Sequence, residues 1–222
     1  MRRTLANETA KTVIPIAGGK GGVGKTLIAA NLGAALAMEG HPTILVDLDF
    51  GNSNLHTLVG LANRFPGVGD YVAASPARSL ATLAVETDIP NLKFIPGDGR
   101  MPFLANMTHS QKQQIIRDLK TLSARYILLD LGAGSSFNVI DLFSVSDRGL
   151  VITTPEFPST MSMLVFLKNL VFRMVDQELK DDPDLVDIRQ QIHVQSMAAP
   201  RLTVAAIREN VRERNPSYAE RI

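Results

Sequence analysis

The residues best suited to chemistry lie in one glycine-rich segment near the start of the chain. Gly19, Lys20, Gly21, Gly22, Val23, Gly24, Lys25 and Thr26 fit the pattern G-x-x-x-x-G-K-[ST]. Glycines let the backbone turn so that successive N–H groups point inward and cradle phosphate oxygens. Lys25 adds a positive charge for the terminal phosphates, and the Thr26 hydroxyl can bind Mg²⁺. The segment therefore predicts binding of a nucleotide with magnesium.

Three aspartates follow two apolar runs further along the chain. Asp47 and Asp49 come after residues 43–46, and Asp130 comes after residues 126–129. Open α/β sheets bind ligands at the carboxyl ends of their strands, which is where these side chains are expected. Asp130 can hold magnesium through water, and Gly132 lets the following segment approach a terminal phosphate. Asp47 and Asp49 face opposite ways on an extended chain, so we expect different roles for them.

A parallel sheet with helical crossovers must position these residues. The sequence predicts strands at 13–17, 43–47, 92–95, 126–130 and 149–154, several of them continuous apolar runs typical of strands buried on both faces. Helices are expected at 25–39, 110–123, 138–145, 158–180, 185–192 and 203–214, with Gly40 ending the first and Ser110 capping the second. The predicted fold class is α/β, a doubly wound, mostly parallel sheet flanked by helices.

Composition excludes several classes of function. Lys+Arg 23 against Asp+Glu 22 gives a net charge of +1, so no global field favours nucleic acid or membrane. Cysteine is absent, which excludes disulfides, iron–sulfur clusters and thiol nucleophiles, and the four histidines lack ligand spacing, so no metal cluster is expected. No apolar stretch is long enough to span a membrane. We expect a soluble, cytoplasmic protein.

The loop and the aspartate segments resemble those of the MinD/ParA family of ATPases. Lys20, one residue into the loop, is similar to the signature lysine of that family's deviant phosphate loop (deviant Walker A). The run from Asp47 to Leu55 looks like its first switch. The Asp130-Leu131-Gly132-Ala133-Gly134 run looks like its second switch, in the form of the flagellar-number regulator branch, and Thr154-Pro155-Glu156 is similar to the Pro-Glu after the next strand.

The resemblance implies an ATP-binding, slowly hydrolysing P-loop ATPase with ATP/ADP and Mg²⁺ as cofactors. Such proteins form a homodimer when ATP is bound and come apart after hydrolysis. Lys20 would reach the partner's nucleotide, Asp49 would position the attacking water, and Asp47 and Asp130 would organise magnesium with Thr26. Asn54 matches a switch position that faces the γ-phosphate or the partner, and Gly132, in the second switch, is expected to be a nucleotide-binding residue. The implied role is a spatial-positioning switch of the flagellar, septum or chromosome-partitioning type, with a protein activator.

The chain also departs from the family pattern. No strand is expected after about residue 181, so the sheet would lack the family's last strands, and the adenine-contacting residue with them. We expect residues 1–11 to be a short N-terminal extension and residues 12–222 to form a single ATPase domain, helical from about 181. Two other functions stay open: an ATP-dependent metabolic ligase or amidase on the same fold, and an ATP-locked scaffold with negligible hydrolysis.

The last predicted helix raises the question of a surface partner. Val204, Ile207 and Val211 form an apolar stripe with Arg208 and Arg212 beside it. Basic surfaces can hold DNA nonspecifically, and basic amphipathic helices can lie on membranes. The interleaved glutamates favour an ordinary solvated helix. A peripheral position at a membrane or nucleoid is therefore a hypothesis that rests on this helix.

Overall fold

The computed structural model describes residues 11–50, 52–73, 79–97, 107–198 and 203–222. The chain divides into two compact units, Met1–Met163 and Leu164–Ile222. The second unit begins inside a long helix, so the helical part includes residues well before 181. Apart from Lys11, the expected N-terminal extension lies outside the described residues.

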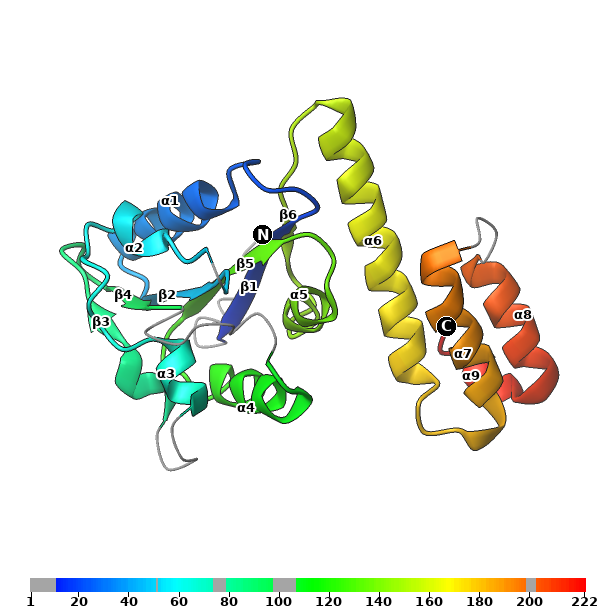
Figure 1. Ribbon diagram of the computed structural model, residues 1–222. Coiled ribbons are helices and arrows are strands. Elements are labelled where there is room, and N and C mark those ends of the chain that lie inside the picture. Colours follow the sequence, from blue (N-terminus) through cyan, green and yellow to red (C-terminus); the bar gives the residue numbers. More distant parts are fainter. Residues whose placement is uncertain (1–10, 51, 74–78, 98–106, 199–202) are drawn as a thin grey trace, which may run out of the picture. The chain divides into compact units, whose positions relative to one another are not determined.

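Within the described residues, the first unit is built on a six-stranded sheet in the order β3-β4-β2-β5-β1-β6 (Figure 1). The strands are β1 Thr12–Gly18, β2 Thr43–Leu48, β3 Val85–Glu86, β4 Leu92–Ile95, β5 Tyr126–Ala133 and β6 Leu150–Val151. All neighbours pair in parallel except β3, which is antiparallel to β4. The predicted fold class is confirmed. β3 was not predicted, because a two-residue strand carries no pattern.

The central strands explain why the apolar runs are continuous rather than alternating. All six residues of β2 are buried, as are six of the eight in β5, because helices cover both faces of the sheet. Pro15 fits in β1 because β6 pairs only with Ile16 and Ala17. At Pro15 the strand therefore has a ladder partner on one side alone, a position that a residue without an N–H tolerates.

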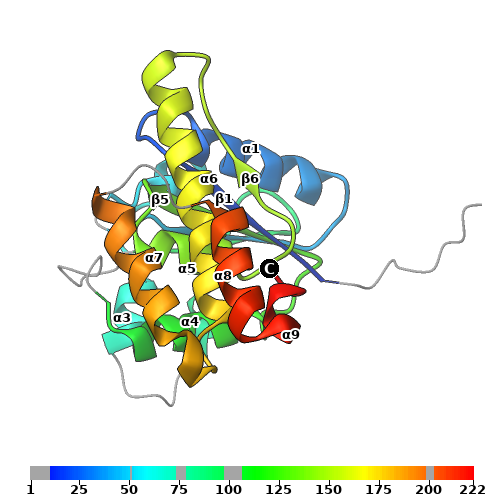
Figure 2. The same cartoon turned by 90° about the vertical axis from the view of Figure 1, so that its right-hand side faces the viewer.

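Helices cover both faces of this sheet (Figures 1 and 2). α1 (Lys25–Met38) and α2 (Leu55–Leu58) lie on one face, and α4 (His109–Leu119) and α5 (Phe137–Phe143) lie on the other. Gly40, with φ +85°, ends α1 as predicted, and the N–H groups of Gly40 and His41 bond the carbonyls of Ala37 and Leu36.

Two local predictions in this unit need correction, and three short elements were not predicted. The cap of α4 is Thr108, not Ser110, because Thr108 and Gln111 form a reciprocal capping box. β6 is shorter than the predicted strand at 149–154. α2 and α3 (Val68–Ala73), with the 3₁₀ turn Leu80–Leu83, were not predicted, because segments of four to six residues are too short for a helical period.

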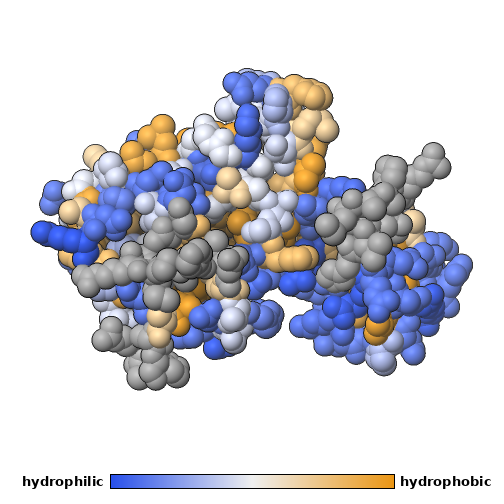
Figure 3. All heavy atoms as spheres, viewed as in Figure 1, coloured by the Kyte–Doolittle hydropathy of each residue, from blue (hydrophilic) through white to orange (hydrophobic). Residues whose placement is uncertain are grey.

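The second unit is a small helical bundle with its own core. It contains the end of α6 (Phe157–Glu178), the 3₁₀ turn Pro183–Leu185, α7 (Val186–Ala198), α8 (Val204–Arg214) and α9 (Pro216–Ala219). Its core residues are Val175, Leu179, Leu185, Ile188, Ile192, Ile207, Val211 and Ala219. The side of this unit seen in Figure 3 is mainly hydrophilic.

Ion pairs and hydrogen bonds tie the helices of this bundle together. Asp176 on α6 is 3% exposed and pairs with Arg173 and with Arg189 of α7. Asp182 accepts a hydrogen bond of 2.7 Å from the Asn215 amide. Within the described parts of the chain, no helix combines the length and the apolar character needed to cross a membrane.

The apolar stripe of α8, which raised the question of a surface partner, packs inside the helical bundle. Ile207 and Val211 are fully buried in the core of the second unit. Arg208 donates to the carbonyl of Ala219, and Arg212 pairs with Glu209. These contacts favour the solvated-helix interpretation of α8.

Candidate functional site

The glycine-rich loop connects β1 to α1 and leaves a helix start open toward it. Gly22 and Gly24 have φ values of +77° and +94°, a left-handed conformation that favours glycine. Gly24 is the N-cap of α1, and no side chain caps the helix. Its first N–H groups are therefore available to an anion, and the helix dipole points the same way. Lys25, the first residue of α1, is only 6% exposed.

A cavity of about 560 Å³ lies over this helix start. Its lining combines the loop with the two segments that resemble switches: Gly21, Gly22, Gly24, Lys25, Thr26, Leu27, Asp49, Asn52, Asn54 and Ala133. The structure thus brings most of the predicted site residues to one cavity. Gly19, Lys20, Val23, Asp47, Asp130 and Gly132 are not on its wall. Leu27, Asn52 and Ala133 were not predicted to line it.

Asp47 holds the first of those segments in place. It is completely buried, and one oxygen accepts from the Asp49 N–H at 3.1 Å. The other accepts from the Ser53 hydroxyl at 2.6 Å and from the Leu55 N–H at 3.2 Å. Burial raises the pKa of Asp47 to about 6, although these hydrogen bonds oppose the rise. Asp47 therefore fixes the chain on both sides of Asn52 and Asn54.

Asp130 has the opposite environment on the neighbouring strand. It pairs in register with Asp47, and it is 1% exposed. Both of its carboxylate oxygens are buried without a hydrogen-bond partner among the described residues. Burial raises the pKa of Asp130 to about 7, against the opposing influence of the Thr26 hydroxyl and Lys25. A buried carboxylate with unused oxygens is expected to serve a ligand or a cation.

The donor set at this point suits magnesium. Asp130 and the Thr26 hydroxyl are hard oxygen groups, the kind that Mg²⁺ prefers. In the described residues there is no group of three or more acidic, histidine or cysteine side chains that could hold a metal alone. Mg²⁺ bound with a nucleotide typically takes one or two protein ligands and completes its shell with phosphate oxygens and water.

Two glycines allow the acidic segments to approach each other. A Cβ on Gly132 would lie 3.1 Å from an oxygen of Asp49. A Cβ on Gly97 would lie 2.8 Å from the Asp47 carbonyl oxygen and 3.0 Å from the Ser53 hydroxyl. The contribution of Ser53 and Gly97 could not be predicted, because each acts through a neighbour from another segment.

The two residues at the start of the loop differ in their surroundings. Gly19 lies against the backbone of α6, where a Cβ would overlap the carbonyl group of Ser162 and the N–H of Met163. Lys20 is exposed and outside the cavity, with no ion pair to any other described residue. The loop thus contacts a second helix through Gly19 and presents Lys20 to solvent.

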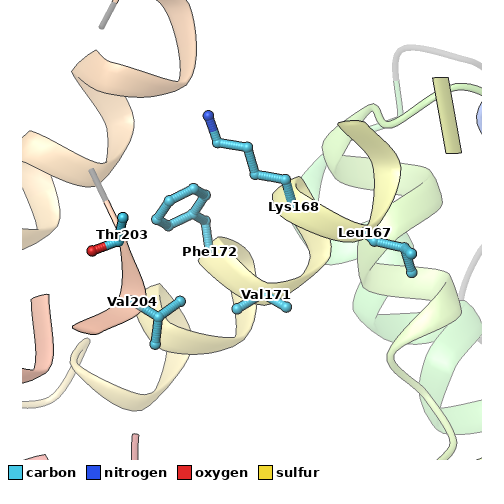
Figure 4. Close-up of a pocket in the computed structure, with 6 residues that line it drawn as sticks. All are labelled: Leu167, Lys168, Val171, Phe172, Thr203 and Val204. Carbon is cyan, nitrogen blue, oxygen red and sulfur yellow. The ribbon is translucent and has the colours of Figure 1, made fainter. Parts of the chain in front are cut away.

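The second unit carries a different kind of hollow. It measures about 360 Å³ and is lined by Leu167, Lys168, Val171, Phe172, Thr203 and Val204. In Figure 4, Phe172 points from α6 toward Thr203, whereas Leu167 lies on the other side of the helix. Lys168 stands 5.5 Å from the centre of the Phe172 ring. This lining is mainly apolar and contains no set of groups suited to catalysis.

Residues 14–213 match the family model for the CobQ/CobB/MinD/ParA nucleotide binding domain. The chain belongs to this family. The "putative septum site-determining protein MinD" of Tupiella akineta is 33% identical over 153 residues, which is 68% of this chain and 49% of that protein. The chain therefore spans about half the length of the curated relatives it matches.

Solved structures of the MinD/ParA family agree with the fold. MinD of Pyrococcus horikoshii complexed with Mg-ADP is 22% identical, with a TM-score of 0.61 over 74% of this chain and 66% of that one. The MinC:MinD cell division protein complex of Aquifex aeolicus is 27% identical, with a TM-score of 0.59 over 72% of this chain and 65% of that one. The family resemblance drawn from the loop is confirmed.

Proposed function

We propose that this chain binds ATP with Mg²⁺ in the 560 Å³ cavity and hydrolyses it slowly, as a switch that forms a homodimer with ATP. The observation that carries the proposal is the open start of α1. Left-handed glycines, an uncapped helix and the buried Lys25 converge there beside Asp130. The Mg-ADP complex of the Pyrococcus horikoshii protein supports the choice of ligand.

The loop and Asp130 divide the work of holding the nucleotide. In this proposal the N–H groups of Gly21, Gly22 and Gly24 bind phosphate oxygens, and Lys25 neutralises their charge. Thr26 and Asp130 hold the magnesium ion, which stabilises negative charge on the phosphates. The family resemblance implied a magnesium role for Asp47 as well. Because both oxygens of Asp47 already accept hydrogen bonds, we assign it instead to positioning Asp49 and Asn54.

Asp49 and Lys20 are proposed to act in the hydrolytic step. The Asp49 backbone is held by Asp47, and its side chain lines the cavity, where it can orient a water molecule toward the terminal phosphate. Lys20 is exposed at the mouth of the loop and supplies its charge to the nucleotide of a second copy. Such a group provided by a partner makes hydrolysis depend on dimerisation.

The cellular role that fits best is spatial positioning of the septum-site type. The support is the 33% identity to a putative MinD over two thirds of this chain. The MinC:MinD cell division protein complex of Aquifex aeolicus supports the proposal that this chain also has a protein partner. The branch of flagellar-number regulators remains a second member of the same class, favoured only by the Asp130–Gly134 segment. In either role the protein would act in the cytoplasm; α8, on which the membrane or nucleoid hypothesis rested, buries its apolar stripe in the helical bundle.

The test is the mass of the protein in solution with each nucleotide, measured by light scattering. We expect wild type to double its mass with Mg²⁺ and a nonhydrolysable ATP analogue and to remain a monomer with ADP. Lys20→Ala should bind the analogue by calorimetry without doubling. Lys180→Ala, an exposed lysine in the second unit, is the matched control and should behave as wild type.

Phosphate release separates the switch from its alternatives. Asp49→Ala should bind ATP normally and lose at least about tenfold in hydrolysis rate, since it removes the group that orients water. Negligible phosphate release by both wild type and Asp49→Ala would favour an ATP-locked scaffold, and equal, measurable rates would remove Asp49 from the hydrolytic step. Monomers under all conditions would reject the dimer but leave nucleotide binding intact. Transfer of phosphate to a small carboxylic acid would favour the ligase alternative.

A further inference from the structure

The segment between β2 and α2 contributes three polar side chains to the nucleotide cavity. Asp49, Asn52 and Asn54 line it together with the phosphate loop and the start of α1. Asp49 and Asn54 belong to the residues that the sequence predicted for the site, whereas Asn52 does not. Its place in the cavity raises the question of what an asparagine does there.

Hydrogen bonds fix the backbone on both sides of Asn52. The Asn52 N–H donates to the Asp49 carbonyl oxygen at 3.1 Å. The buried Asp47 carboxylate accepts from the Asp49 N–H at 3.1 Å and from the Leu55 N–H at 3.2 Å. Asn52 is therefore held at a set position beside Asp49 before any ligand binds. A side chain on an ordered backbone loses less entropy when it binds a ligand.

Asn52 and its neighbour Ser53 serve different surroundings. The Ser53 hydroxyl donates to the Asp47 carboxylate at 2.6 Å, and a Cβ on Gly97 would lie 3.0 Å from the hydroxyl oxygen. Asn52 is exposed and lines the cavity instead. Ser53 thus anchors the segment to the sheet edge, while Asn52 is presented to a ligand.

The carboxamide groups of Asn52 and Asn54 have hydrogen-bonding capacity to spare. Neither carboxamide is hydrogen-bonded to another residue in the part of the chain that the structure describes. Asn54 is the N-cap of α2, yet its side chain does not cap the helix, although asparagine is among the best capping residues. An asparagine side chain offers two N–H donors. Both side chains can therefore donate to a ligand in the cavity.

The chemistry of the lining indicates which part of the nucleotide Asn52 meets. The loop amides and Lys25 serve the phosphates at the start of α1. Asp49 is proposed to orient water toward the terminal phosphate, and Asn52 is bonded to the Asp49 backbone. An ionised carboxylate can only accept hydrogen bonds, whereas a neutral carboxamide can donate to phosphate oxygens. Asn52 therefore supplies a donor at the end of the cavity where Asp49 supplies none.

We propose that Asn52 is a specificity-determining residue, which favours ATP over ADP by donating a hydrogen bond to the γ-phosphate. The inference rests on the proposed function, since it requires ATP in this cavity with its terminal phosphate toward Asp49. ADP lacks the γ-phosphate and leaves the donor unused. Hydrogen bonds to charged oxygens are stronger than those between neutral groups, so the loss of this one affects ATP measurably.

The test is calorimetric titration with Mg-ADP and with Mg²⁺ and a nonhydrolysable ATP analogue, in a Lys20→Ala parent. That parent should bind without dimerising, so the affinities are not mixed with assembly. Asn52→Ala should weaken binding of the analogue at least about tenfold and leave that of ADP within about twofold. Asn52→Asp keeps the shape but replaces the donor by a negative charge, so it should weaken the analogue further.

Asn210→Ala and Asn210→Asp are the matched controls, because they change an exposed asparagine of α8 in the second unit. Both should bind the two nucleotides as the parent does, and thermal melting verifies the fold of every variant. Equal losses for the analogue and ADP in Asn52→Ala, or parental affinity for the analogue in Asn52→Asp, would overturn the inference while ATP binding stands. A parent that binds neither nucleotide would overturn the proposed function, and this inference with it.

Discussion

Asp47 and Asp130 stand side by side on β2 and β5, yet their environments differ completely. Asp47 accepts hydrogen bonds from Asp49, Ser53 and Leu55, whereas Asp130 has unused oxygens. Burial raises the pKa of Asp47 to about 6 and that of Asp130 to about 7. Sequence alone placed both carboxylates at the correct sheet edge. It could not distinguish their roles, because the partners of Asp47 follow it in a segment without periodic pattern.

The raised pKa of Asp130 predicts an unusual pH dependence in metal-free protein. Between about pH 4 and pH 7 the folded state binds more protons than the unfolded state, so the free energy of unfolding falls as pH rises. In Asp130→Asn this residue no longer titrates, so its contribution to the fall in the free energy of unfolding disappears. We expect the variant to be more stable than wild type by on the order of 1–3 kcal/mol at about pH 8, with the difference shrinking toward pH 4.

Urea unfolding in EDTA at both pH values measures this difference. With Mg²⁺ and ADP present, wild type should be the more stable of the two proteins, because the variant has lost a negatively charged oxygen ligand. A pH slope that is the same in the two proteins would show that Asp130 is ionised in the folded state throughout the range.

Helix α1 illustrates what can be predicted for an element. Its start at Lys25 follows from the loop pattern, and its end follows from Gly40. Gly33, in the middle, looks like a weak point for a helix. The structure explains why glycine stands at this position: α1 packs so closely on β2 that a Cβ on Gly33 would lie 2.8 Å from the side chain of Leu45. Contacts of this kind depend on how elements pack, so one-dimensional patterns do not reveal them.

Gly33→Ala should therefore destabilise the protein, although alanine is the better helix former. Overpacking against Leu45, which is fully buried, costs about 1–3 kcal/mol and exceeds the gain of up to ~1 kcal/mol in helix propensity. Chemical unfolding of Gly33→Ala, Leu45→Ala and the double variant tests the cause. In the Leu45→Ala background the glycine change should cost little or be stabilising. Additive effects would place the cost elsewhere.

At the scale of the whole molecule, the sequence predicted one domain and the structure contains two compact units. The first holds every residue of the candidate site. The second has a separate core, built by α6 to α9. The boundary falls inside α6, where a continuous helical pattern gives no sign of it. The longer helices α6, α7 and α8 were predicted, because each shows a helical period, whereas the four-residue α9 was not.

Because the two units have separate cores, a mutation that removes a buried side chain from one core should leave the other unit unaffected. Ile207→Ala removes a fully buried side chain of the second unit and should destabilise it by about 2–5 kcal/mol. A small bundle has little stability to lose, so its amides should exchange hydrogen much faster. Calorimetry should find the affinity of the first unit for Mg-ADP unchanged.

Val186→Ala is the control for this experiment, since Val186 belongs to the same unit but is 44% exposed. It should leave hydrogen exchange nearly as in wild type. Loss of nucleotide binding in Ile207→Ala would mean that the first unit depends on the second for its fold.

Gly19 brings the backbone of the phosphate loop into direct contact with the backbone of α6. With no side chain between them, the backbone of the loop rests on Ser162 and Met163, the last residues of the first unit. A loop that tightens around a ligand by even a fraction of an ångström must displace these turns or lose the contact. Any such displacement would be met first by the amino-terminal turns of α6, which belong to the same unit as the loop.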